Sequence, residues 1–267
     1  MVEESFMNSI EKEKILLDNE LVPEPVLWLR FFPRWALITG LTTVIIPVLF
    51  LVGLGQQASD NALGKEFVEL LQAARSPYMF RAAWAFDAIV WLMLGGILIS
   101  AAGLLRRHAP VRSTFILVCG IAQLLGAFGS FTRLDGISDL AVHYSSALPN
   151  QQIGLLESYL NLSRVINSSN HISVLLQGIG YLLVSWGVLS MRGFPRWLAT
   201  WLALPGLLGI AQFCLFVTGA PYLFALNVIG LIAGNIALNF AIMITLWRPP
   251  NSLVSSVAGN MMAEIRE

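Results

Sequence analysis

The sequence predicts an all-α fold: a bundle of six transmembrane helices with both termini on the cytoplasmic side. Three observations lead to this prediction, namely an apolar composition, six stretches long enough to cross a bilayer, and arginines gathered in alternate connections. Of the 267 residues, 56% are hydrophobic and only 12% are charged, whereas about a quarter of the residues of a soluble protein are charged. The lipid bilayer is therefore the expected surrounding of most of the chain.

Each of the six stretches is long enough on simple geometry. A helix rises ~1.5 Å per residue, so about 20 mainly apolar residues cross ~30 Å of hydrocarbon. The stretches that meet this length are residues 35–55, 81–105, 113–131, 171–191, 197–218 and 221–247. The chain then divides into a cytoplasmic segment (1–34), a six-helix transmembrane domain (35–248) and a cytoplasmic tail (249–267).

The connections between the stretches predict their orientation. Cytoplasmic connections of membrane proteins carry an excess of Arg and Lys, and the short connections around residues 106–112 and 192–196 are dense in arginine. The alternate connections, 56–80 and 132–170, have few basic residues for their length and should lie outside. Their apolar residues recur at helical spacing, so we expect short amphipathic helices on the outer face.

Composition also excludes several classes of protein. Sixteen basic and sixteen acidic residues balance, which disfavours a nucleic-acid partner. The two cysteines, Cys119 and Cys214, stand alone in apolar stretches and form neither a disulfide framework nor a redox pair. With three histidines and no nucleotide-binding or zinc motif, we expect neither a metal nor a cofactor.

One catalytic pair can be written from the sequence. Ser130 and His171 fall near the outer ends of consecutive predicted spans, as an intramembrane serine hydrolase would require. The residues around Ser130 lack the small-residue turn that usually presents such a nucleophile. We therefore assign no catalytic residue.

Asp87 is the only ionisable residue well inside a predicted span. A carboxylate there costs at least about 2.5 kcal/mol unless it is neutralised, paired or hydrated, so it should face the interior of the bundle. Two interpretations stay open. Asp87 either binds or titrates as part of a site, or it forms a hydrogen bond that joins two helices.

Four carboxamides lie at nearly the same depth as Asp87. Gln177, Gln212 and Asn227 are, like Asp87, six residues from the predicted outer end of their spans, and Gln123 is somewhat deeper. At ~1.5 Å per residue, six residues correspond to about 9 Å below the outer surface. We predict that these five side chains line an outward-facing pocket, the alternative being hydrogen bonds between helices.

The last span carries a separate pattern. Gly230 and Gly234 form a GxxxG motif, and Asn235 and Asn239 keep a four-residue spacing. Glycines at this spacing allow helices to approach closely. We assign these four residues to helix packing, within the chain or with another subunit.

Two functional hypotheses follow from these residues. The first is binding or transport of a small polar or amphiphilic ligand, with Asp87 as the key group. The second is a non-catalytic scaffold or regulatory subunit, which meets a protein partner or a second copy through its glycine faces and the amphipathic segment 10–21. A lipid-modifying enzyme has less support, because such chemistry generally needs a histidine or a second carboxyl within the membrane.

Several short motifs carry a family resemblance. Residues 170–173 read Asn-His-Ile-Ser before a helix rich in Gly and Leu, residues 193–198 read Gly-Phe-Pro-Arg-Trp-Leu, and Arg81 and Arg106 bracket a helix with an early acid. These motifs resemble the uncharacterised bacterial multipass proteins grouped as domain of unknown function 4386. The resemblance implies six helices in a bacterial cytoplasmic (inner) membrane and implies no reaction. Members of that group often have an acid in the final helix, where this chain has Asn235 and Asn239, so no charge-dependent role is transferred there.

Overall fold

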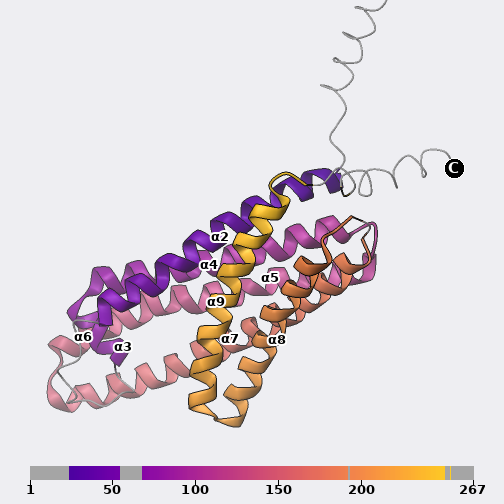
Figure 1. Ribbon diagram of the computed structural model, residues 1–267. Helices are drawn as coiled ribbons and strands as arrows, with labels where there is room; N and C mark the ends of the chain where they lie inside the picture. The colour runs from indigo at the N-terminus through magenta and orange to yellow at the C-terminus, as the bar shows by residue number, and fades with distance from the viewer. Residues whose placement is uncertain (1–23, 55–67, 192, 250–252, 254–267) are drawn as a thin grey trace, which may run out of the picture.

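The computed structural model describes residues 24–54, 68–191, 193–249 and 253, and every regular element within them is a helix (Figure 1). The predicted amphipathic segment 10–21 and most of the predicted tail lie outside these residues. In chain order the helices are α2 (Glu24–Leu54), α3 (Val68–Arg75), α4 (Pro77–Leu105), α5 (Pro110–Thr132), the π-helix η2 (Arg133–Ile137), α6 (Ser138–Ser146), α7 (Pro149–Leu189), α8 (Arg196–Thr218) and α9 (Pro221–Leu246).

Among the described residues, five helices are long and apolar enough to cross a membrane, as an integral membrane protein requires. Three of them are α4, α7 and α8. The other two are the continuous helix Pro110–Ser146, which begins with α5, and the part of α9 from Leu226 to Leu246. The predicted span 35–55 falls in α2, but the structure does not describe Gly55 or the side chains of residues 46–54. A sixth span and the membrane topology therefore remain predictions.

Prolines and one glycine set the ends of these helices. Pro77, Pro110, Pro149 and Pro221 each stand in the first turn of a helix, where the missing N–H has no helical partner to lose. Gly219 follows α8 with φ at +67°, the left-handed conformation that commonly ends a helix. Gly219 ends α8 and Pro221 begins α9, which explains the tight turn between these two helices.

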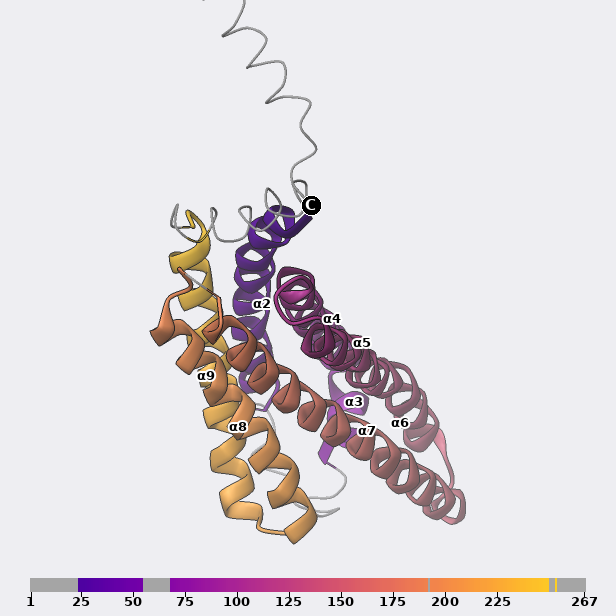
Figure 2. The same cartoon turned by 90° about the vertical axis from the view of Figure 1, so that its right-hand side faces the viewer.

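The six long helices form a closed ring. α2 packs on α4, α4 on α5, α5 on α7, α7 on α8, α8 on α9, and α9 returns to α2. Figure 2 shows the α8–α9 pair on one side of the molecule and α4 with α5 on the other, with α7 between them. Side chains that point inward from this ring can therefore meet across it even when they are distant in sequence.

Two contacts of the ring depend on glycine. A Cβ added to Gly95 would lie 2.8 Å from the carbonyl oxygen of Gly120, and one added to Gly178 would lie 2.7 Å from that of Gly206. Real Cβ atoms essentially never come this close to another atom. The α4–α5 and α7–α8 pairs therefore pack backbone to backbone, as small residues allow in membrane helices.

The connection 132–170 differs from its prediction as short helices lying on the outer face. α5 continues through η2 into α6, and α7 runs for 41 residues without a break. At ~1.5 Å per residue, α7 is about 60 Å long, twice the ~30 Å of hydrocarbon that it would cross. α6 and residues 149–170 of α7, here called the hairpin, project beyond the ring (Figure 1).

A hydrophobic cluster at the base of the hairpin explains why it projects from the ring. The short helix α3 lies against α6, and its residues Leu70 and Ala73 are buried. They join apolar side chains of α4, η2, α6 and α7, namely Phe80, Trp84, Ile137, Ala141, Tyr159 and Ile166. Part of each apolar face predicted for these segments is thus buried against the others, and this burial favours a hairpin that projects from the ring.

Candidate functional site

Asp87 lies half-buried on α4 and accepts two hydrogen bonds on one oxygen. Its Oδ2 accepts from Nε1 of Trp91, at 3.1 Å, and from Oγ of Ser130 on α5, at 2.5 Å. Trp91 is one helical turn from Asp87, so both side chains project from the same face of α4. Gly126 of α5 leaves the space that the Trp91 ring occupies. Both bonds reach an acceptor and stabilise the carboxylate anion.

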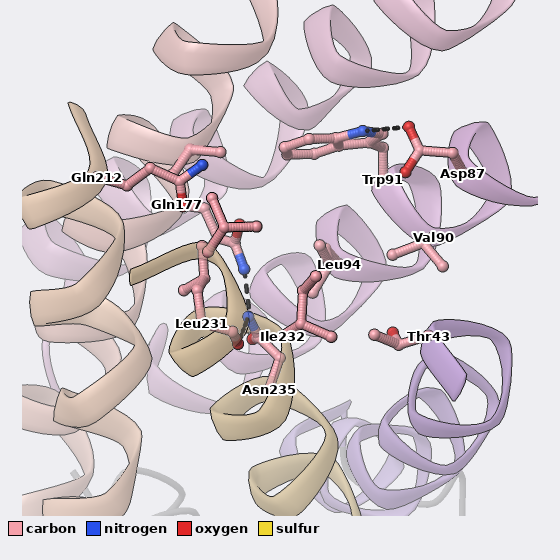
Figure 3. Close-up of a pocket in the computed structure, with 12 residues that line it drawn as sticks. Thr43, Asp87, Val90, Trp91, Leu94, Gln177, Gln212, Leu231, Ile232 and Asn235 are labelled. Atoms are coloured by element: carbon pink, nitrogen blue, oxygen red, sulfur yellow. Dashed lines mark hydrogen bonds between the residues drawn. The ribbon is translucent and has the colours of Figure 1, made fainter. Parts of the chain in front are cut away.

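A cavity of about 190 Å³ opens beside this carboxylate, between α2, α4, α7, α8 and α9 (Figure 3). Its polar or aromatic lining consists of Thr43, Asp87, Trp91, Gln177, Gln212 and Asn235. Its apolar lining consists of Val90, Leu94, Val174, Val228, Leu231 and Ile232. For comparison, an apolar cavity of about 150 Å³ accommodates benzene. The space therefore fits a molecule the size of one ring with a short substituent.

Two amides in the lining are bonded to each other. Nε2 of Gln177 donates to Oδ1 of Asn235 at 3.4 Å, and Nδ2 of Asn235 donates to the carbonyl oxygen of Leu231 at 2.9 Å (Figure 3). Asn235, which we had assigned to helix packing, thus links α7 to α9 and also faces the cavity.

Gln212 is different from these amides. It is 7% exposed, it faces the cavity, and its Oε1 is buried without a hydrogen-bond partner among the described residues. A buried acceptor without a partner is unfavourable by about 1–3 kcal/mol. The cavity therefore contains one carboxylate and one unsatisfied carbonyl from different helices.

Three of the five residues predicted to share a pocket do so, and two lie elsewhere. Asp87, Gln177 and Gln212 line the cavity. Gln123 is fully buried between α5 and α7, where Nε2 donates to the carbonyl oxygens of Cys119 at 2.9 Å and Ser173 at 3.4 Å. Asn227 donates to the carbonyl oxygen of Leu208 at 2.9 Å and so joins α9 to α8. The ligand-binding role itself stays a prediction.

The remaining residues assigned to packing lie on two faces of α9. Among the described residues, a Cβ added to Gly230 or Gly234 would meet only Leu208 of α8, at 3.9 and 3.7 Å, which is ordinary contact. Asn239 is fully buried, and neither of its side-chain polar atoms has a hydrogen-bond partner among the described residues. Its Cβ lies against the position of Gly40 on α2. Asn239 therefore belongs to the α2–α9 contact.

The serine of the conceivable hydrolase pair has another partner. Oγ of Ser130 bonds Asp87 and also donates to the carbonyl oxygen of Gly126 at 3.1 Å. The ring of His171 stacks on Phe216 of α8, with 3.7 Å between ring centroids. Ser130 is therefore a hydrogen-bond donor to the carboxylate, and the structure does not pair it with His171 as a nucleophile with its base.

A polar cluster near Asp87 was missed at the sequence level. Arg133, on η2, is 7% exposed; it donates to Oδ1 of Asn167, its Nε lies 3.6 Å from Oε2 of Glu69, and its guanidinium lies 4.4 Å above the Trp84 ring. These contacts join α3, α4, η2 and α7. Arg133 follows Ser130 by one helical turn, so the cluster adjoins the cavity carboxylate.

The comparison with known proteins agrees with the sequence resemblance. A family model described as "Domain of unknown function (DUF4386)" matches residues 38–247, which is most of the chain and includes every residue that lines the cavity. No curated protein and no solved structure gives a significant match.

Proposed function

Because the chain belongs to the family described as Domain of unknown function (DUF4386), a description that assigns no activity, we propose a function from the cavity itself. The protein binds a small amphiphilic ligand between α2, α4, α7, α8 and α9, either to move it across the membrane or to respond to it. The polar end of the ligand meets Asp87 and Gln212, and its apolar part fills the space beside Leu94 and Leu231.

The observation that carries this proposal is the unsatisfied Oε1 of Gln212 in the wall of a cavity that also holds Asp87. A ligand group that donates to this oxygen removes an unfavourable term of about 1–3 kcal/mol. Interhelical bonding explains Gln123 and Asn227, because each donates to a backbone carbonyl of another helix. It does not explain Gln212, which bonds no neighbouring helix among the described residues.

The placement of arginine supports an orientation for the site. The α4–α5 connection, with Arg106 and Arg107, and the α7–α8 connection lie at the end of the bundle where α2 begins, opposite the hairpin (Figure 1). By the positive-inside rule we place that end in the cytoplasm and the hairpin outside. Both termini are then cytoplasmic, in the bacterial inner membrane that the family resemblance implies.

A thermal-unfolding measurement on the purified protein in detergent tests the proposal. Benzylamine and benzyl alcohol are suitable probes because each is about one ring in size. At least one of them should raise Tm in a saturable manner, since a ligand that binds only the folded state stabilises it. Leu94→Trp, which fills the cavity, should abolish this shift.

The matched control is Leu207→Trp, on a side chain of α8 that is 59% exposed and outside the cavity. It should keep the full shift. Equal shifts in the wild type and in Leu94→Trp would place the probes in the detergent or on the protein surface, and the proposed function would then be rejected.

A further inference from the structure

We infer that the ligand is a small organic cation: an amine whose ammonium group meets Asp87 and Gln212 and whose apolar body, about one ring in size, fills the rest of the cavity. This inference rests on the proposed function and names the chemical class of its ligand.

The first argument is the inventory of donors and acceptors in the cavity wall. Several donors are already used: Nε1 of Trp91 bonds Asp87, one N–H of Gln177 Nε2 bonds Asn235, and one N–H of Asn235 Nδ2 bonds a backbone carbonyl. The Thr43 hydroxyl likewise donates to the carbonyl oxygen of Thr39 at 2.7 Å. The amide nitrogens of Gln212 and Asn235 keep N–H groups, but the charged group that faces the cavity, Asp87, is an acceptor, and so is the buried Oε1 of Gln212, which has no partner among the described residues. An ammonium group has donors and no acceptor, so it complements this wall.

The second argument is charge. Within the described residues, no Lys, Arg or His forms an ion pair with Asp87. Arg133, one turn beyond Ser130, acts electrostatically on Asp87 from beyond ion-pair distance, and its direct partners are Glu69 and Asn167. The two hydrogen bonds to Asp87 both reach Oδ2. An intramembrane carboxylate is normally paired, and a cationic ligand at Oδ1 supplies a direct ion pair that the described residues do not.

The third argument is the shape and polarity of the remaining space. The indole ring of Trp91 lies beside the carboxylate, as aromatic rings do in sites that bind ammonium groups (Figure 3). Beyond it the wall is aliphatic, with Leu94, Leu231 and Ile232. Ammonium itself or methylamine would leave this apolar wall unfilled. A cavity of about 190 Å³ instead suits a ring that carries a short aminoalkyl arm.

Three nearly isosteric probes separate charge from shape: benzylamine, benzyl alcohol and benzoate. At pH 7 they are a cation, a neutral molecule and an anion. Titrated into the full-length protein in detergent, benzylamine should bind most tightly and benzoate should not bind. Asp87→Asn should weaken benzylamine by at least about tenfold, the affinity that one charge-assisted hydrogen bond supplies. The same variant should leave benzyl alcohol within about twofold of the wild type, a change of less than 1 kcal/mol.

Two further variants keep the test informative if Asp87→Asn does not fold. Gln212→Leu should weaken benzylamine severalfold and should not reverse the order of the probes. Asp139→Asn removes a carboxylate on α6 whose side chain is 72% exposed, and it should change nothing.

The outcomes separate the two claims. Equal binding of benzylamine and benzyl alcohol, unaffected by Asp87→Asn or Gln212→Leu, overturns the cation inference and leaves the proposed function standing. Tighter binding of benzoate than of benzylamine also overturns the inference. Absence of binding by all three probes, with no effect of Leu94→Trp, overturns the proposed function as well.

Discussion

At the scale of single residues, the hydroxyl of Ser130 controls how Asp87 presents its second oxygen. Its bond to Oδ2, at 2.5 Å, fixes the carboxylate against α5, and Trp91 fixes it from α4. Ser130 itself is fully buried. The carboxylate is therefore positioned before any ligand arrives, which reduces the ordering that binding requires.

Removing this hydroxyl should cost stability. Ser130→Ala leaves Asp87 with one donor instead of two, and we expect the free energy of unfolding to fall by about 1–3 kcal/mol. Ser158→Ala, on an exposed serine that bonds only the Gly154 carbonyl, is the control and should change it by less than about 0.5 kcal/mol. Chemical unfolding in mixed micelles measures both. Indistinguishable midpoints for the two variants would show that the bond contributes nothing.

Residue type and depth predicted part of the site and could not predict the rest. Asp87, Gln177 and Gln212 stood out because polar side chains are rare in apolar stretches, and all three line the cavity. Gln123 and Asn227 have the same chemistry, but they bond neighbouring helices. Counting along a helix gives depth, whereas the rotation of each helix about its axis decides which way a side chain points. That rotation is set by packing.

At the scale of helices, close glycine contacts hold the wall of the cavity in place. Gly178 and Gly206 bring α7 against α8, and these two helices carry Gln177 and Gln212. A change in their separation would move both amides. The GxxxG pattern in α9 predicted close helix packing, but the closest backbone contacts lie at glycines of other helices, such as Gly95 and Gly178.

Alanine substitutions should destabilise the protein at the tightly packed Gly178 and should have little effect on stability at Gly230 in the GxxxG motif. Gly178→Ala places a Cβ 2.7 Å from the Gly206 carbonyl oxygen, and such overpacking typically costs about 1–3 kcal/mol. Gly230→Ala meets only Leu208 at 3.9 Å and should stay within about 0.5 kcal/mol of the wild type. Thermal unfolding of the two variants side by side is sufficient. The reverse order of stability would contradict the packing described for α7 and α8.

Arg133 should control the stability of the hairpin relative to the ring. Arg133→Lys keeps the charge but loses the planar group that bonds Asn167 and lies over Trp84. We expect faster amide hydrogen exchange in α6 and in residues 149–166 of α7, with little change in α8. Arg164→Lys, on an exposed side chain of the same hairpin, is the control. Unchanged exchange in Arg133→Lys would mean that the hydrophobic cluster alone supports the hairpin.

At the scale of the whole molecule, the long apolar helices were predictable and the hairpin was not. Apolar stretches predicted the helices closely because backbone groups in lipid must be paired within a helix. The connection 132–170 was expected to form short separate helices on the outer face, yet no proline occurs between Pro110 and Pro149 or between Pro149 and Pro195. That absence was a usable signal for continuous helices. The π-helix at Arg133 had no such signal, because it reflects contacts made in three dimensions.

The orientation of the ring gives a further prediction. With native Cys214 replaced by Ala and Cys119 left buried, single cysteines can be placed at Gly154 in the hairpin and at Arg107 in the α4–α5 connection. An impermeant maleimide applied to intact cells should label Gly154→Cys and should reach Arg107→Cys only after permeabilisation. The opposite pattern would invert the topology and place the hairpin in the cytoplasm.

The central claim is that the space between α2, α4, α7, α8 and α9 holds a ligand. The most direct measurement is a crystal structure with 3-bromobenzylamine, in which the anomalous signal of bromine locates the probe. We predict a bromine peak between Leu94 and Leu231, with the amine at Asp87. Bromine peaks found only along lipid-facing side chains, with the cavity empty of the probe, would contradict the claim.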